Sequence, residues 1–337
     1  MSKIIGSFLS LQYLCRDFFM RLTRKYSLLL LLSMGVIALW SFATAETTPL
    51  TKSQLGELLF FDPILSADST ISCGSCHKPE FAFADTVAFS QGVGGRLGKR
   101  NTPSVMNMSD RESFFWDGRA GTLEAQAIFP IEDHNEMNLP VADAIRRLNR
   151  SKKYQKYFMQ VFAEGANKEN LGIALASFER TLETANTPLD RWQNDEKADT
   201  LNPQQIRGRE LFFSKAKCNE CHFTGDFTAD EFRGIGLFDG DKHNDSGRYI
   251  ITKNKADIGK FKVPGLRNIA LTAPYMHDGS MKTLREVIDY YDNPGKMLPD
   301  GLNRDSVLQK PLGLTEQEKQ DIEAFLRALT DDRFIQK

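Results

Sequence analysis

Cys73-Gly74-Ser75-Cys76-His77 is the stretch from which the rest of the sequence can be interpreted. Two cysteines separated by two residues, with a histidine directly after the second, form the pattern by which a chain binds haem through two thioethers and offers the iron an imidazole. The pattern recurs as Cys218-Asn219-Glu220-Cys221-His222. The sequence therefore predicts two covalently bound haem c groups, held by Cys73, Cys76, His77, Cys218, Cys221 and His222.

Two other interpretations of the cysteine pairs are a zinc site built from both pairs and a thioredoxin-like redox pair. Neither requires a histidine directly after the second cysteine, and here that histidine occurs twice. The fifth cysteine, Cys15, lies in a segment that we expect to be removed, so no structural disulfide is predicted.

An export signal is predicted at the N-terminus. A basic cluster at residues 21–25 precedes an apolar run over residues 28–40, and Ala43-Thr44-Ala45 provides the small residues that a signal peptidase requires. We expect residues 1–45 to be a signal peptide, because the apolar run is short for a membrane span. An uncleaved N-terminal anchor is the alternative. In either case the folded part lies outside the cytoplasm, and we predict a periplasmic protein.

The charge balance argues against nucleic acid as a partner. The sequence has 43 Lys/Arg and 44 Asp/Glu residues. Residues 1–45 contain five of the basic residues and one of the acidic residues, so the exported chain keeps 38 basic and 43 acidic residues. A mildly acidic protein of this kind has no electrostatic attraction for phosphate backbones.

The surroundings of the two haem motifs match one another. Three pairs of segments recur in the same order: Gly56–Phe61 with Gly208–Phe213, Pro103–Asn107 with Pro264–Asn268, and Trp116-Asp117-Gly118 with His277-Asp278-Gly279. Recurrence of this kind indicates an internal duplication of one haem-binding unit.

The remaining patterns are helical. Residues 141–162 and 169–184 have helical periodicity, Thr315-Glu316-Gln317-Glu318 is a capping box, and no alternating strand pattern of any length occurs. The predicted fold class is all-α, with two cytochrome c-like haem domains related by internal duplication.

A domain boundary is predicted where Pro188 and a polar run over residues 194–200 interrupt the helical pattern. This boundary divides an N-terminal domain, residues 46–195, from a C-terminal domain, residues 196–337.

The second axial position of each haem iron decides what the protein can do. Leu284, Val287, Ile288 and Tyr291 recur at helical spacing, which places Tyr291 on the buried stripe of a helix and Tyr290 outside it. A core aromatic is the simpler interpretation of Tyr291. Four other residues are rival ligands of the second haem: Met276, His277, Met281 and Met297.

The internal repeat makes the two haem groups unequal. Counting 14 residues onward from Trp116 and His277 gives Pro130 and Tyr291. Proline cannot coordinate iron. If the two halves superpose, Tyr291 closes the second haem whereas the first is left open.

An open haem needs a distal acid or base for peroxide chemistry, because cleavage of the O–O bond moves a proton from one oxygen to the other. Residues 126–137 offer Gln126, Glu132, Asp133, His134 and Glu136. Each of these alone is more often a surface group than a catalyst. The loop over residues 90–101 has four glycines and no histidine, so we expect it to be mobile and not to cap the iron.

From Leu55 to Leu329 the sequence resembles the bacterial di-haem cytochrome c peroxidase superfamily. The resemblance is carried by Cys73–His77, Arg100–Ser104, Phe115–Arg119, Glu136-Met137, Phe178–Thr181, Cys218–His222 and Ala273–Gly279. It implies that the first haem reacts with hydrogen peroxide, that the second receives or stores electrons, and that Trp116 relays electrons between them. It also implies Glu136 as the distal acid/base, Gln126 as its neighbour, and a calcium ion held by Asn101, Thr272 and Pro274.

Two departures from the well-known peroxidases are similar to the MauG-like branch. A displaceable histidine is replaced here by about Val93, and the methionine that closes the second haem is replaced by Tyr291. The resemblance then implies a permanently five-coordinate first haem. An anionic oxygen ligand stabilises ferric and higher states, so Tyr291 is expected to lower the potential of the second haem.

The predicted function is a periplasmic di-haem c-type peroxidase that reduces hydrogen peroxide at the N-terminal haem. Its electrons would come from a small redox donor protein, a c-type cytochrome or a cupredoxin, and pass through the C-terminal haem and Trp116. One alternative is a MauG-like oxidase that uses a bis-high-valent di-haem state to oxidise a partner protein or substrate. Another is a di-haem electron-transfer cytochrome. A homodimer is compatible with the sequence, which does not set the oligomeric state.

Overall fold

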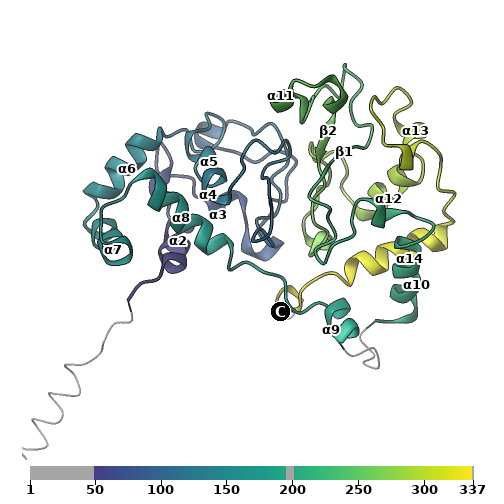
Figure 1. The fold of residues 1–337 in the computed structure, drawn as a ribbon, viewed down its shortest axis with the longest axis horizontal. Helices are drawn as coiled ribbons and strands as arrows, with labels where there is room; N and C mark the ends of the chain where they lie inside the picture. The colour runs from purple at the N-terminus through teal and green to yellow at the C-terminus, as the bar shows by residue number, and fades with distance from the viewer. Residues whose placement is uncertain (1–48, 195–200, 336–337) are drawn as a thin grey trace, which may run out of the picture. The chain divides into compact units, whose positions relative to one another are not determined.

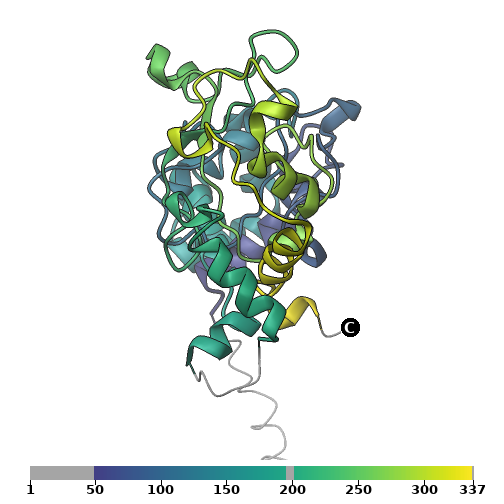
Figure 2. The ribbon, with the colours of Figure 1, turned by 90° about the vertical axis from the view of Figure 1, so that its right-hand side faces the viewer.

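Short helices joined by long loops make up the chain (Figure 1 and Figure 2). The computed structural model describes residues 49–194 and 201–335, so the predicted signal peptide, residues 1–45, and Cys15 lie outside the described residues. Within those ranges the regular strands are β1 (Phe232–Gly234) and β2 (Lys260–Lys262), which pair antiparallel. No helix of the described part is long and apolar enough to cross a membrane. The fold is mostly helical, as predicted, and strands of three residues are too short to produce an alternating pattern.

Two large hydrophobic cores divide these helices between an N-terminal part, residues 50–185, and a C-terminal part, residues 186–335. A third, small cluster consists of Phe114, Ala120, Leu123 and Ala176. The helices of the N-terminal part are α2 (Lys52–Phe61), α3 (Cys73–Cys76), α4 (Leu123–Gln126), α5 (Phe129–Glu132), α6 (Val141–Arg150), α7 (Lys152–Phe162) and α8 (Lys168–Glu179). Those of the C-terminal part are α9 (Pro188–Asn194), α10 (Pro203–Phe212), α11 (Tyr249–Thr252), α12 (Leu284–Asp292), α13 (Pro294–Met297) and α14 (Glu316–Arg327).

Local sequence signals explain several helix ends. The capping box predicted before the last helix is confirmed: the Thr315 hydroxyl accepts from the Glu318 N–H at 3.2 Å, and the Glu318 carboxylate accepts from the Thr315 N–H at 2.7 Å. The periodic stretch 141–162 is two helices, because Ser151 ends α6 and caps α7. The prediction for residues 169–184 extends too far, since α8 ends at Glu179 and the next residues form turns.

In both parts two helices cross, and Figure 1 shows the second of these crossings, of α10 with α14. The backbone of α2 meets α8 at Gly56, where a Cβ would clash with the carbonyl of Ala174. Likewise α10 meets α14 at Gly208, where a Cβ would clash with the carbonyl of Asp321. These glycines are required because the two helix backbones touch.

Aromatic rings pack in the same way beside each crossing. The Phe60 and Phe178 rings lie 5.1 Å apart between centroids, and the Phe212 and Phe325 rings lie 5.4 Å apart. All four side chains are buried or nearly so. Each crossing is therefore fixed by a glycine and by an edge-to-face aromatic pair.

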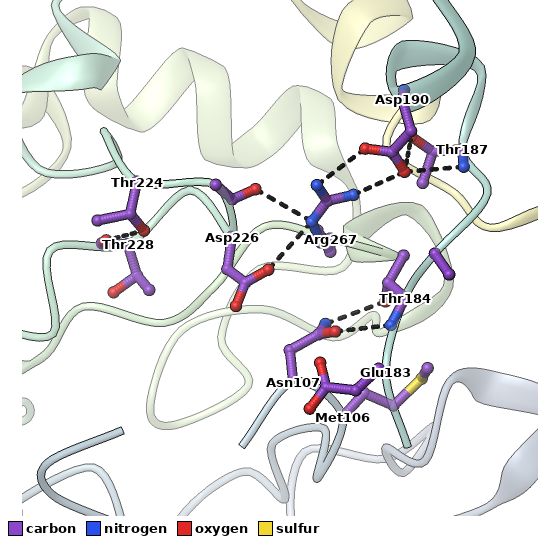
Figure 3. Close-up of polar contacts among 12 residues, drawn as sticks. Met106, Asn107, Glu183, Thr184, Thr187, Asp190, Thr224, Asp226, Thr228 and Arg267 are labelled. Carbon is purple, nitrogen blue, oxygen red and sulfur yellow. Dashed lines mark hydrogen bonds and ion pairs between the residues drawn. The ribbon is translucent and has the colours of Figure 1, made fainter. Parts of the chain in front are cut away.

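The N-terminal and C-terminal parts are joined by a polar cluster around Thr184 (Figure 3). Asn107 and Asn268, which occupy matching sequence positions, both donate their side-chain Nδ2–H to the Thr184 hydroxyl, at 3.0 and 2.8 Å. The backbone N–H of Thr184 donates in turn to Asn107 Oδ1 at 2.8 Å. Nearby, Arg267 forms a bidentate pair with Asp190 at 2.9 and 3.0 Å. The Thr184 hydroxyl thus accepts a hydrogen bond from one buried side-chain amide of each part.

We predict that Thr184→Val destabilises the protein by about 1–3 kcal/mol, because two buried amide groups lose their acceptor. Thr184→Ser keeps the oxygen and is the matched control, expected to stay within about 0.5 kcal/mol of the wild type. Urea unfolding of the haem-loaded protein measures both values. Equal stabilities of the Val and Ser variants would show that the hydroxyl does not join the two parts.

Candidate haem-binding site

A largely apolar cavity of about 1440 Å³ is lined by residues of both parts of the chain. The cavity walls contain most of the residues that the sequence singles out. They include Cys73, Cys76, His77, Asn101, Trp116, Gln126, Pro130, Glu136, Cys218, Cys221, His222, Thr272, Pro274, Met276, His277 and Tyr291. Residues far apart in the sequence thus meet around one space.

Each motif histidine is oriented by a backbone carbonyl. The Nδ1–H of His77 donates to the Phe83 carbonyl at 3.0 Å, and that of His222 donates to the Phe227 carbonyl at 2.6 Å. Both phenylalanines have φ 57°, which turns the carbonyl toward the ring. With Nδ1 protonated, Nε2 of each ring is free to bind iron.

Burial keeps both imidazoles neutral. It lowers the pKa of His77 and lowers the pKa of His222 to about 4. The neutral ring is the form that binds a metal, so both histidines are ready to act as ligands at neutral pH.

The four motif cysteines are half-buried and free. Burial raises the pKa of Cys76 to about 11 and that of Cys218 to about 12, so these thiols are neutral rather than thiolates. Among the described residues, no group of three or more His, Cys, Asp or Glu side chains could hold a metal ion. These observations fit two haem groups, each held by two thioethers and a histidine, and do not fit a zinc site.

Two polar side chains face the cavity near His77. Burial raises the pKa of Glu136 to about 7, and neighbouring Asp133 adds to the shift while Arg119 opposes it. Gln126, at the end of α4, has a buried Oε1 atom with no hydrogen-bond partner among the described residues. Of the remaining candidates, Glu132, Asp133 and His134 are exposed. Glu136 and Gln126 are therefore the pair suited to handle a small polar molecule.

The glycine-rich loop, residues 90–101, lies against the segment that carries Glu136. The Val93 N–H donates to the Glu136 carbonyl at 2.8 Å, and Arg96 Nε donates to the His134 carbonyl at 2.6 Å. A Cβ on Gly92 would clash with the carbonyls of Asn135 and Glu136. The glycine at position 92 thus permits close approach, and these contacts attach the loop to the segment around Glu136.

Helix α12 lines the cavity, and its Tyr291 lies near the second-motif cysteines, Cys218 and Cys221. Tyr291 is half-buried and lines the cavity, and burial raises its pKa. The prediction that Tyr290 lies outside the buried stripe is wrong, because its side chain is 1% exposed and its hydroxyl donates to the Ile235 carbonyl at 2.7 Å. Helix α12 is covered on more than one side, so a single stripe does not describe its burial.

The rival ligands are placed differently from one another. Met276 and His277 line the cavity, whereas Met281 is buried in the C-terminal core and Met297 is 53% exposed. The positions of Met281 and Met297 do not favour a role as ligand.

Trp116 lines the cavity and is held by the backbone of Asn101. The indole Nε1–H donates to the Asn101 carbonyl at 2.8 Å, and the Asn101 N–H donates to the His277 carbonyl at 2.8 Å. Trp116 and His277, which match in the sequence repeat, are thus connected through one residue. Asn101 Nδ2 donates to the Val87 carbonyl at 3.2 Å, and Thr272 Oγ1 donates to the Ile269 carbonyl at 3.4 Å.

Two residues of this site were not given a role from the sequence. Glu179, known only as part of a family landmark, is 4% exposed and lines the cavity. Arg100, also at the cavity, pairs with Asp117 at 2.7 Å and with Asp245 at 2.7 and 2.9 Å. The sequence could have indicated Glu179, because a glutamate among the apolar residues of a helix is unusual. It could not have indicated the ion pair of Arg100 with Asp245, because the two residues lie 145 positions apart.

Comparisons with known proteins show which chains this one is similar to. Residues 51–198 match a family model described as di-haem cytochrome c peroxidase. The chain is 38% identical over 291 residues to methylamine utilization protein MauG of Methylorubrum extorquens, covering 84% of this chain and 80% of that protein. It is also 38% identical over 291 residues to cytochrome c peroxidase Ccp of Escherichia coli, covering 84% of this chain and 58% of that protein. A crystal structure of a MauG-like protein associated with microbial copper homeostasis superposes with a TM-score of 0.76 at 33% identity, covering 84% of this chain and 90% of that one.

Proposed function

The chain belongs to the di-haem cytochrome c peroxidase family, and we propose that it reduces hydrogen peroxide at the haem held by Cys73, Cys76 and His77. Membership makes it a di-haem oxidoreductase with two c-type haem groups. The observation that carries the choice of haem is the pair Glu136 and Gln126, which face the cavity beside Pro130, a residue that cannot bind iron.

Glu136 is proposed to move the proton. The haem supplies the electrons for the net reaction, in which hydrogen peroxide, two electrons and two protons give two water molecules. Glu136 takes a proton from one peroxide oxygen and returns it to the other, a role that requires a pKa near the working pH. The unpartnered Oε1 of Gln126 accepts a hydrogen bond from the peroxide O–H and orients it. The apolar walls exclude bulk water.

At the second haem we propose His222 and Tyr291 as the two ligands, with Trp116 as the electron relay between the centres. Support comes from the position of Tyr291 in the cavity wall and from the hydrogen bond that fixes the Trp116 indole. A buried phenolate needs a compensating cation, and ferric iron is one. A calcium ion held by Asn101, Thr272 and Pro274 stays a proposal that rests on the resemblance and on their common place in the cavity wall.

The two parts are further proposed to be copies of one haem-binding unit. The matched crossings at Gly56 and Gly208 and the matched histidine contacts support this origin. The first core ends at Leu182 and the second begins at Leu189, which favours a domain division a few residues before the predicted boundary at 195/196. A periplasmic location reached through the signal peptide and a homodimeric state are predictions from the sequence.

A MauG-like oxidase is the second candidate function. It is favoured by two observations: Tyr291 lies in the cavity where well-known peroxidases have methionine, and Val93 is buried on the glycine-rich loop where they have a displaceable histidine. In this case the oxidised target is a partner protein or substrate, whereas the peroxidase takes electrons from a c-type cytochrome or a cupredoxin. A pure electron-transfer cytochrome does not account for Glu136 and Gln126.

We predict that Glu136→Gln slows the reaction with hydrogen peroxide by about 10²-fold or more while both haem groups still attach. Because the base form accepts the proton, the wild-type rate should rise as the pH increases through about 7, and the variant should lose this rise. Stopped-flow rates as a function of pH measure both effects. Glu132→Gln, at an exposed carboxylate four residues away, is the matched control and should react at the wild-type rate. Wild-type kinetics in Glu136→Gln would remove its assigned role.

We predict that Tyr291→Phe abolishes the low-spin ferric signal of the second haem in electron paramagnetic resonance spectra, because the phenyl ring cannot bind iron. Tyr290→Phe is the matched control: it loses a hydrogen bond to the Ile235 carbonyl but should keep the signal. A signal that survives in Tyr291→Phe would point to Met276 or His277 as the ligand.

One equivalent of hydrogen peroxide added to the diferric protein separates the two candidate functions. The conventional peroxidase requires prior one-electron reduction before it turns over, whereas the MauG-like oxidase reacts in the diferric state. Given Tyr291 and Val93, we expect rapid reaction of the diferric protein, measured by absorbance changes at both haem groups. No reaction until a reductant is added would favour the conventional peroxidase.

A further inference from the structure

Glu179 is a second buried carboxyl on the first-haem side of the cavity. It ends α8, is 4% exposed and lines the cavity. Its Oε2 atom is buried with no hydrogen-bond partner among the described residues. The neighbouring cation does not neutralise it, because Arg180 turns to Glu124 of α4 and pairs with it at 2.6 Å. An unpaired carboxylate in such surroundings is costly, so the group is held in its neutral form or finds a partner in the cavity.

The repeated helix crossing shows that the haem-binding unit does not need this carboxyl. In the first crossing Gly56 faces Ala174 and Phe60 packs on Phe178. In the second, Gly208 faces Asp321 and Phe212 packs on Phe325. In this register the counterpart of Glu179 is Leu326, which is 7% exposed and also lines the cavity. A leucine fills the position in one part, whereas the other part buries an acid. Glu179 therefore serves the first haem in particular.

Glu179 lies near Cys73, one of the two cysteines that would hold that haem. A negative charge on Glu179 is the largest electrostatic contribution to the raised pKa of the Cys73 thiol, after burial, so the two groups are close. The other titratable groups near it are Glu124 and Arg180, which pair with one another. The other helices packed on α8 place no charged side chain against Glu179. Lys52 and Glu57 of α2 are exposed. Arg147 of α6 donates to the carbonyls of Ile64 and Ser66.

We propose that Glu179 exchanges a proton with solvent in step with the redox state of the first haem. When an external one-electron donor reduces ferric to ferrous iron, the carboxylate takes up one proton, and when the iron is reoxidised the proton leaves. The added electron makes a nearby negative charge less favourable in a low-dielectric site, which raises the proton affinity of the carboxylate. Burial, reinforced by Glu124 and opposed by Arg180, already raises the pKa of Glu179 to about 8. The proposal rests on haem attachment at Cys73 but not on peroxide reduction.

The test is a spectroelectrochemical titration of both haem groups as a function of pH. Above about pH 8, where the ferric protein has lost this proton, the potential of the first haem should fall with pH. One proton per electron shifts the redox equilibrium up to tenfold per pH unit, or about 59 mV. Glu179→Gln should flatten the fall for the first haem and leave the pH dependence of the second haem unchanged. Glu179→Leu, which copies Leu326, should do the same.

Controls separate Glu179 from its neighbours. Glu57→Gln removes an exposed carboxylate of α2 and should keep the wild-type slope. Redox-induced infrared difference spectra should contain the carbonyl stretch of a protonated carboxyl, and Glu179→Gln should lose this band. An unchanged slope and an unchanged band in Glu179→Gln, or an equal shift of both haem potentials, would overturn the proposal. The haem potentials are measured without hydrogen peroxide. The result of this test is therefore independent of whether the enzyme reduces hydrogen peroxide.

Discussion

The donation of a histidine Nδ1–H to a phenylalanine carbonyl is the interaction on which each haem site depends. It occurs once at His77 and once at His222, and in both places it leaves the buried ring neutral with Nε2 available. The accepting residues, Phe83 and Phe227, both have a positive φ, which costs about 1 kcal/mol for a residue with a Cβ. The rest of each unit supports that geometry, because the glycine crossing and its aromatic pair fix the helices behind the ring.

On this shared framework a few substitutions make the two sites different. Where the second site has Tyr291 the first has Pro130, and where the second has Leu326 the first has Glu179. Each exchange adds a potential ligand to one cavity wall or a buried acid to the other while leaving the helix crossings intact. One packing arrangement can therefore carry either set of side chains, since the backbone contacts do not involve them, and this is what the proposed pair of a closed electron-transfer centre and an open reactive centre requires.

Patterns confined to a few consecutive residues predicted the structure well. The Thr315 capping box and the helix that carries Tyr291 are examples, because their stabilising contacts lie within one or two turns. The contacts that were missed come from elsewhere in the chain. Tyr290 is buried because Ile235 of a distant loop accepts its hydroxyl, and the loop over residues 90–101 contacts the segment around Glu136. The periodicity of a sequence does not indicate such distant partners. The second buried face of α12 and the contacts of the glycine-rich loop could therefore not be predicted from one sequence.

That loop connects the two kinds of chemistry in the molecule. Near its start, the Val93 N–H donates to the backbone carbonyl of Glu136, the residue proposed to move a proton. At its end, Asn101 accepts from the Trp116 indole and donates to the His277 carbonyl, while Arg100 pairs with Asp117 and Asp245. A displacement of the loop would therefore move the acid/base and the indole together. Glycine at position 92 lets the loop approach the carbonyls of Asn135 and Glu136 closely enough to make the first of these contacts, which is a physical reason for a residue without a Cβ at this place.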